Sequence, residues 1–260
     1  MTKISDIMEA MEHLAPSSLA EGWDNVGLLV GDPDEEVGRI LLALDIVDEV
    51  VDEARELGAG LIITHHPPIF KPLERITSQC ALGRRLIRLI RQNTAVFTSH
   101  TNLDIAEGGT NTELSRILGL TDIENLLSNG MGRVGNLPEP LTLEELAAKL
   151  KHSLNANYTS YAGETSRVIR RVGLCTGAAA GGEFFSAAAE KGCDAYITGD
   201  VRYHAAQAAH DLGLALVDAT HYHTEVIVLK PLGAYLQQRL PGLDISISQH
   251  NAQDIRMLET

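Results

Sequence analysis

Basic and aromatic residues are scarce in this sequence. Its 21 lysines and arginines are outnumbered by 35 aspartates and glutamates, giving a net charge of −14 over 260 residues, and aromatic residues make up 4%. Nonspecific binding to nucleic-acid phosphates needs clustered Lys and Arg, so this charge balance argues against a general nucleic-acid-binding surface. A local basic pocket for a small anion is still compatible with the composition.

Cysteines and long apolar runs are also scarce. Cys80, Cys175 and Cys193 are odd in number and form no Cys-x-x-Cys pair, a pattern typical of a reducing compartment. No apolar run approaches the roughly 18 residues of a membrane span. The N-terminus has the pattern of an amphipathic helix rather than a signal sequence. We therefore expect a cytoplasmic protein that does not contact a membrane.

Two widespread catalytic signatures are missing as well. The sequence contains neither Gly-x-Ser-x-Gly nor a Walker-type Gly-Lys-Ser/Thr, and no cysteine has a persuasive catalytic partner. Nucleophilic-serine and P-loop chemistry are therefore the least favoured functions.

What the sequence does contain is an alternation of short apolar strands and amphipathic helices. Such alternation indicates βαβ units, so the predicted fold class is α/β, with mainly parallel or mixed sheets flanked by helices. A Gly- and Pro-rich segment at 128–140 predicts a domain boundary. The alternation of strands and helices is similar on either side of it, which is compatible with a duplication. A polar turn leading into a short strand is expected within 23–31. Further strands are expected at 39–45, 61–64, 94–99, 157–162, 167–174, 194–198, 214–218 and 243–248, and helices at 3–14, 48–57, 79–92, 111–118, 142–154, 182–191, 202–212 and over about 15 residues after 225.

Several predicted strands end in residues that bind metals. The apolar run 61–64 leads into His65-His66, and other strand ends carry Asp104, Asp200, and His221 with Glu225. Ligands of open α/β sheets gather outside the carboxyl ends of the strands. Imidazole together with carboxylate suits Zn, Fe or Mn better than Ca or Mg. The number of such groups exceeds the need of one tetrahedral ion and favours two ions close together.

Each of these groups also has a plainer interpretation. A lone His-His pair after a strand is more often part of a loop than a ligand pair, and Asp104 alone would be a turn or helix-cap residue. His100, His204 and His223 either contact a substrate, support other groups, or are ordinary hydrogen-bonded polar residues. The sequence alone leaves these alternatives open.

Five short motifs stand out in the sequence: Trp23-Asp24-Asn25-x-Gly27-Leu28, Thr64-His65-His66-Pro67, Thr101-Asn102-Leu103-Asp104 with Gly108-Gly109-x-Asn111, Thr198-Gly199-Asp200, and His221-x-x-x-Glu225. Taken together, they resemble those of the Nif-three-like family, often labelled GTP cyclohydrolase 1 type 2 homologues, in its short form. The resemblance implies a dinuclear metal site at the cleft between two α/β domains, 1–127 plus 217–260 and 128–216. It implies the ligands His65, His66, Asp104, His221 and Glu225 for two divalent ions per subunit (Zn, Fe, Mn or Ni), and a toroidal homohexamer.

The function that this resemblance implies is that of a metal-dependent hydrolase acting on a nucleotide or related heterocycle. A metal-bound hydroxide would attack C8 of guanine and open the imidazole ring with release of formate. His100 or His204 would orient the substrate. The alternatives are a non-enzymatic metal-binding scaffold or regulatory assembly with protein partners, and a phosphoesterase.

Overall fold

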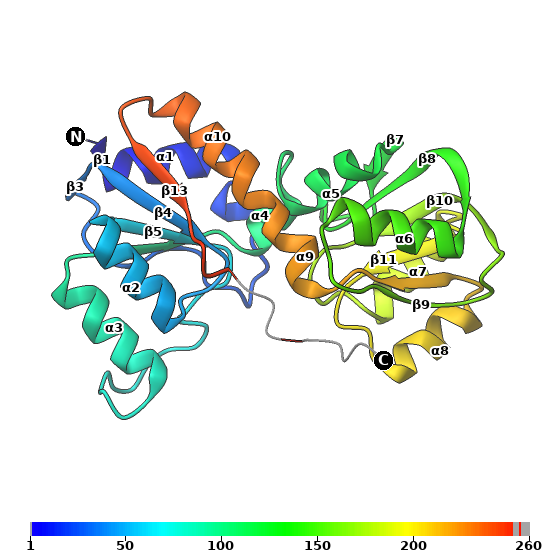
Figure 1. The fold of residues 1–260 in the computed structure, drawn as a ribbon, viewed down its shortest axis with the longest axis horizontal. Helices are drawn as coiled ribbons and strands as arrows, with labels where there is room; N and C mark the ends of the chain where they lie inside the picture. The colour runs from blue at the N-terminus through cyan, green and yellow to red at the C-terminus, as the bar shows by residue number, and fades with distance from the viewer. Residues whose placement is uncertain (1, 252–254, 256–260) are drawn as a thin grey trace. The chain divides into compact units, whose positions relative to one another are not determined.

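The chain forms two compact units, shown in Figure 1. The computed structural model describes residues 2–251 and 255. One unit comprises the described chain up to Glu107 and the described part of Val228–Ala252, and the other runs from Gly108 to Ile227. The second unit is therefore an insertion in the first. Of the expected domain 1–127 plus 217–260, positions 1, 252–254 and 256–260 lie outside the described residues.

The first unit contains a five-stranded mixed sheet in the order β13-β4-β5-β6-β2. Neighbouring strands are parallel except β2, which is antiparallel to β6. The elements are β1 (Thr2–Lys3), α1 (Ile4–Leu14), the 3-10 helix η1 (Ser17–Leu19), β2 (Gly27–Val30), β3 (Glu36–Val37), β4 (Arg39–Ala43), α2 (Asp48–Leu57), β5 (Leu61–Thr64), α3 (Ala81–Arg91), β6 (Ala95–Thr98), α4 (Thr101–Ile105), α10 (Leu229–Arg239) and β13 (Asp244–Ile247).

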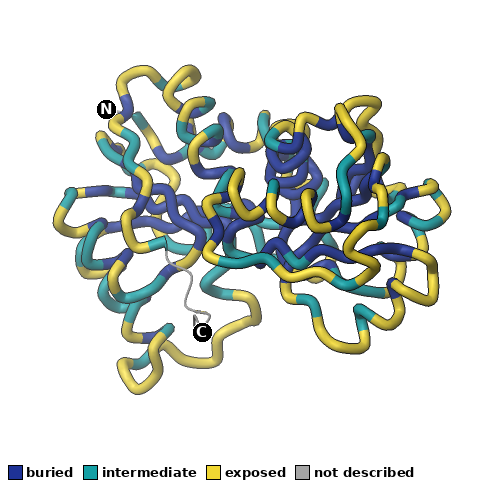
Figure 2. Tube along the Cα trace, turned by 45° about the vertical axis from the view of Figure 1, so that its right-hand side comes forward, coloured by how far each residue is buried: buried dark blue, intermediate teal, exposed yellow. Residues whose placement is uncertain are grey.

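Both faces of this sheet are covered by helices, as parallel strands require. Leu41 and Ile62 belong to the core that α2 and α3 share with one face, while α1 and α10 lie over the other face (Figure 1). Gly233 brings α10 close to the sheet, because a Cβ there would lie 3.3 Å from Leu42. The central strands β4, β5 and β6 are consequently buried, and buried segments are drawn dark blue in Figure 2.

The second unit contains a six-stranded sheet in the order β7-β8-β10-β11-β12-β9. Its three central strands, β10, β11 and β12, are parallel, and the others are antiparallel to their neighbours. The elements are α5 (Thr110–Leu118), β7 (Thr121–Asn125), β8 (Arg133–Thr142), α6 (Leu143–Ser153), β9 (Ser160–Ala162), β10 (Val168–Leu174), α7 (Gly182–Glu190), β11 (Ala195–Thr198), α8 (Tyr203–Asp211), β12 (Ala215–Asp218), α9 (His221–Glu225) and the 3-10 helix η2 (Val226–Val228), which ends at the border of the unit.

Strand β8 occupies the segment in which the sequence predicts only turns. Its prolines, Pro138 and Pro140, lie between Asn136 and Leu141, where the pairing of β8 with β10 is irregular. Proline lacks a backbone N–H, so an irregular stretch of a ladder is where a strand tolerates it. The two prolines therefore lie in a distorted stretch of a strand.

The two units repeat one order of elements. In each, a helix and an antiparallel strand (α1 and β2, or α6 and β9) precede three parallel strands, and the antiparallel strand pairs with the third of these. That third strand, β6 or β12, is followed by a five-residue helix, α4 or α9. The prediction of α/β units with mixed sheets flanked by helices is therefore confirmed. None of the helices in the described residues has the length and apolar character that a membrane crossing requires.

Candidate functional site

The first unit brings three imidazoles together at the carboxyl ends of β5 and β6. Candidate ligand atoms of His65, His66 and His100 lie within 4.8 Å of one another. The His65 and His66 rings follow β5 directly, and their centroids are 5.0 Å apart. The His100 ring comes from the residue before α4 and lies 5.1 Å from His65. Such a cluster of nitrogen ligands is what a transition metal needs.

Hydrogen bonds at Nδ1 orient the two histidines that follow β5. Nδ1 of His65 lies 3.0 Å from the Ser99 carbonyl oxygen, and Nδ1 of His66 lies 2.9 Å from Oδ1 of Asp45. Because these oxygens can only accept, Nδ1 donates in both cases, and Nε2 is the nitrogen that could hold a metal. A metal-binding histidine typically has its other ring nitrogen fixed in this way.

His100 is held by the same kind of bond, to a buried carboxylate. Its Nδ1 donates to Oδ1 of Asp24 over 2.9 Å, and Oδ2 of Asp24 accepts from the backbone N–H and the hydroxyl of Thr101. Burial alone would raise the pKa of Asp24, but the bonds from His100 and Thr101 hold that pKa well below its ordinary value. Asp24 is therefore an anion that fixes both the His100 ring and the start of α4.

Replacing Asp24 with asparagine should destabilise the first unit by roughly 2 kcal/mol, the contribution of hydrogen bonds to a charged group. The depressed pKa means that this contribution is complete above the unfolded-state pKa of about 3.9 and is lost as the pH falls below it. Denaturant unfolding of Asp24→Asn and the parent protein at neutral pH and near pH 3 measures the difference. Asp34→Asn, at a largely exposed carboxylate, is the control, and a pH-independent difference would contradict the prediction.

Asp104 adds a carboxylate to the imidazole cluster. It lies in α4, is 8% exposed, and places Oδ1 3.6 Å from Nε2 of His65. That separation is too long for a hydrogen bond. Two ligand atoms each about 2.1 Å from one tetrahedral ion lie roughly 3.4 Å apart. The geometry of this pair therefore fits the shared coordination of one ion.

The second unit has its own histidine and carboxylate, on α9. Nε2 of His221 lies 3.0 Å from Oε2 of Glu225, and Nδ1 of His221 donates to Oδ2 of Asp200 over 2.7 Å. Burial alone would lower the pKa of His221, but these two carboxylates raise it to about 9. A cation bound by Nε2 would have to replace the proton there, because only neutral imidazole binds a metal.

Two glycines let the backbone approach this pair closely. A Cβ on Gly177, which has φ +71°, would lie 2.2 Å from Oε1 of Glu225, and a Cβ on Gly199 would lie 2.4 Å from the backbone nitrogen of His221. The loop after β10 and the end of β11 therefore enclose the His221–Glu225 pair. A side chain at Gly177 would occupy the space of the Glu225 carboxylate, and one at Gly199 would meet the backbone of His221.

Thr220 begins α9 in a strained conformation. Its φ of +66° lies in the left-handed region, where a β-branched residue is a genuine outlier. Its hydroxyl accepts from the backbone N–H of His223 and contacts Nδ1 of the same residue at 2.7 Å. His223 thus supports the start of α9, while His221 is the histidine of this helix that pairs with Glu225.

His204 has a different environment. It lies on α8 with Nδ1 3.0 Å from Oε1 of Gln207, in an exposed part of the helix. His100, which lies within the imidazole cluster, is therefore the better supported of the two candidates for substrate orientation.

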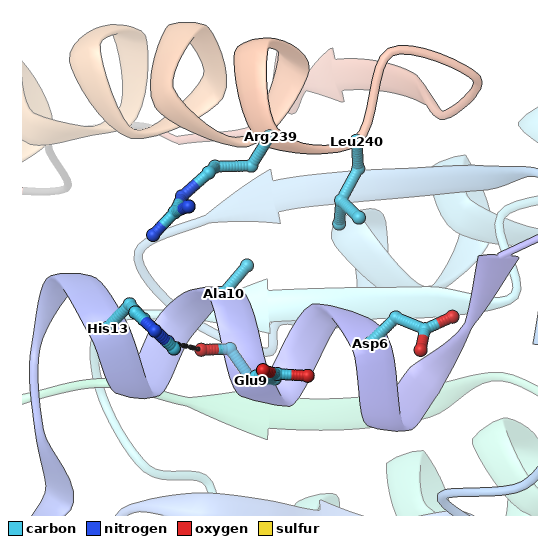
Figure 3. Close-up of a pocket in the computed structure, with 6 residues that line it drawn as sticks. All are labelled: Asp6, Glu9, Ala10, His13, Arg239 and Leu240. Atoms are coloured by element: carbon cyan, nitrogen blue, oxygen red, sulfur yellow. Dashed lines mark hydrogen bonds between the residues drawn. The ribbon is translucent and has the colours of Figure 1, made fainter.

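The first unit also has a surface groove that lies apart from these histidines, between α1 and α10 (Figure 3). It is lined by polar and charged side chains of both helices together with two apolar ones. His13 there bonds the carbonyl oxygen of Glu9 in its own helix. The lining residues are Asp6, Glu9, Ala10, His13, Arg239 and Leu240.

The sequence patterns assigned no role to Asp24 and Asp45, two of the carboxylates that fix the rings. Asp24 and Asp45 lie in turns where aspartate is common, and their roles depend on contacts with His100 and His66, which are distant in sequence. The signal that could have found Asp45 is its place two residues beyond the end of β4, the strand that pairs with β5, which leads into His66. Asp200, considered above as a ligand, instead accepts a hydrogen bond from His221.

Comparison with known proteins agrees with the motif resemblance. The family model described as Duf34/NIF3 (NGG1p interacting factor 3) matches residues 2–254. A Clostridium perfringens protein named GTP cyclohydrolase 1 type 2 homolog is 39% identical over 244 residues, 92% of each chain.

Solved structures give the same result. A hypothetical protein of Staphylococcus aureus is 30% identical with a TM-score of 0.91, covering 98% of this chain and 99% of that one. A Bacillus cereus protein related to NIF3 is 25% identical with a TM-score of 0.93, covering 99% of both chains. The family model covers nearly the whole sequence, and the chain therefore belongs to the Duf34/NIF3 family.

Proposed function

We propose that this chain holds two divalent metal ions through His65, His66, Asp104, His221 and Glu225. One observation carries the proposal: each of the three histidines donates a hydrogen bond from Nδ1 to an oxygen held by the fold. The acceptors are the Ser99 carbonyl for His65, the Asp45 carboxylate for His66 and the Asp200 carboxylate for His221. This is the arrangement that orients metal-binding imidazoles. The donor set of nitrogens and carboxylates suits Zn, Fe, Mn or Ni.

The ligands come from both units, so a dinuclear centre would need His65, His66 and Asp104 together with His221 and Glu225. We propose that it forms at the cleft between the two domains, as the family resemblance implies. The enclosure of Glu225 by Gly177 and the 3.6 Å separation of His65 and Asp104 support ligand roles within each unit.

We further propose that the protein is a metal-dependent hydrolase of the GTP cyclohydrolase 1 type 2 kind, acting on a nucleotide or related heterocycle. The bound ions would supply Lewis acidity and an activated water. His100, held by Asp24 beside His65 and His66, would orient the substrate. The relative from Clostridium perfringens, which is named a GTP cyclohydrolase 1 type 2 homolog, supports this reaction class.

The test is turnover of GTP by protein loaded separately with Mn, Fe or Zn, with formate and phosphate release both measured. We expect formate release that stops when the metal is removed with a chelator. Phosphate release without formate would instead identify a phosphoesterase. Full metal occupancy without either product would overturn the hydrolase and favour the metal-binding scaffold.

The remaining expectations are a cytoplasmic location and assembly into a toroidal homohexamer. The molar mass of the purified protein in solution, measured by light scattering, tests the assembly. A mass of one 28.1 kDa chain would contradict it.

A further inference from the structure

Exposed aromatic rings border the histidine cluster of the first unit. Trp23, the single tryptophan of the sequence, is 59% exposed, and Phe70 is 44% exposed. Their ring centroids are 5.7 Å apart, with the planes inclined at 36°. Side chains of this size usually contribute to a core or an interface. In a chain with 4% aromatic residues, two neighbouring rings at the surface call for a functional explanation.

These rings continue directly into the imidazole cluster. Trp23 and Phe70 both meet His100 edge-to-face, with centroid distances of 6.2 and 6.4 Å. The His100 ring in turn lies 5.1 Å from His65 and 5.6 Å from His66. A continuous set of rings thus extends from the exposed surface to the proposed metal ligands.

The positions of both rings are fixed by the segments that carry them. Trp23 precedes Asp24, whose side chain is fully buried and bonded to His100 and Thr101. The side-chain nitrogen of Asn25 donates to the carbonyl oxygen of Ile69 over 2.5 Å. This bond ties the turn carrying Trp23 to the loop carrying Phe70, so the surface is organised before any ligand arrives.

We propose that Trp23 and Phe70 form a stacking surface for a planar nucleobase beside His100. Bases stack on aromatic side chains whatever their hydrogen-bonding pattern, so the ligand class is a planar heterocycle. This inference deepens the proposed function and rests on it for the reaction, because it names the part of the substrate that the first unit recognises. The continuity of the rings with the histidines favours a small ligand over a second copy of the chain.

The single tryptophan provides the readout. Full-length protein in its purified metal state is titrated with guanosine, which lacks phosphates that would bind metal, and Trp23 fluorescence is followed. We expect saturable quenching by guanosine and none by ribose 5-phosphate. Phe70→Leu, which keeps apolar bulk but removes the ring, should weaken guanosine binding roughly tenfold or more. Tyr203→Leu, at an aromatic residue of the second unit that is 74% exposed, is the matched control and should leave binding unchanged.

Metal content measured on the same samples separates the two proposals. Guanosine binding that depends on Phe70 in protein without bound metal would support the stacking surface and count against the metal centre. Unchanged guanosine affinity in Phe70→Leu would overturn the stacking surface, whatever the metal content. Equal quenching by ribose 5-phosphate would overturn it too. If the Trp23 fluorescence changes with the concentration of protein and not with that of guanosine, the rings form a contact between copies of the chain, and the stacking surface is overturned.

Discussion

His66→Ala is expected to remove at least one metal ion from each chain while the protein stays folded. The His66 side chain is 25% exposed and ends in a bond to Asp45, so its removal opens no core cavity. It does remove a nitrogen ligand of the proposed centre, and the loss of one protein ligand leaves too few donors for stable binding. The direct readout is the metal content per chain, measured by inductively coupled plasma mass spectrometry.

The same loss is expected from a change in the second unit. Glu225→Gln keeps the shape of a side chain that is 3% exposed but removes its charge, so it tests the ligand role with little disturbance of packing. His204→Ala removes an exposed histidine that bonds Gln207 and serves as the matched control. Unchanged metal content in both His66→Ala and Glu225→Gln would show that the ligand assignment is wrong.

Gly177→Ala is expected to disrupt the proposed ligand pair of His221 and Glu225 far more than alanine does at another glycine of similar conformation. Gly177 and Gly192 have φ of +71° and +69°, so alanine pays a similar left-handed penalty of about 1–2 kcal/mol at both. At Gly177 the new Cβ would also meet Oε1 of Glu225 at 2.2 Å, whereas at Gly192 nothing lies within 4 Å.

The difference between the two variants isolates the clash at the site. Gly192→Ala should bind metal like the parent protein, and Gly177→Ala should bind it roughly 10- to 100-fold more weakly, the effect of a disturbed ligand environment. Competition with a metal-binding dye measures the metal affinity of both variants. Thermal unfolding measures the loss of stability that both variants share because each places alanine in a left-handed conformation. Equal affinities in the two variants would show that Glu225 does not need its present position for metal binding.

Local patterns in the sequence were sufficient for most of the strands and helices. Helix α2 illustrates why: it begins with Asp48 and Glu49, which favour the N-terminal end of a helix, and it ends at Gly58 in the left-handed conformation. Helix α6 likewise begins with a capping box of Thr142 and Glu145, a Thr-x-x-Glu pattern that is visible in the sequence. In both cases the signal and the structure it causes lie within a few residues of each other.

The parts that sequence reasoning missed depend on distant contacts. Strand β8 carries Pro138 and Pro140, which resemble linker residues until the irregular pairing with β10 is known. Asp24 is a turn residue by pattern, and only the fold places it against His100, 76 positions later. The proposed ligands could be named because strand ends and family motifs pointed to them, whereas Asp45, which orients the His66 ring, gave no comparable signal.

The insertion of one unit into the other has a consequence for synthesis on the ribosome. Residues 108–227 emerge as a continuous segment, so the second unit can fold while the first still lacks α10 and β13. Until β13 pairs with β4, β4 is an open sheet edge that other nascent chains could join. Premature termination shortly after Val228 would therefore produce a chain whose second unit is intact and whose first unit is prone to aggregate.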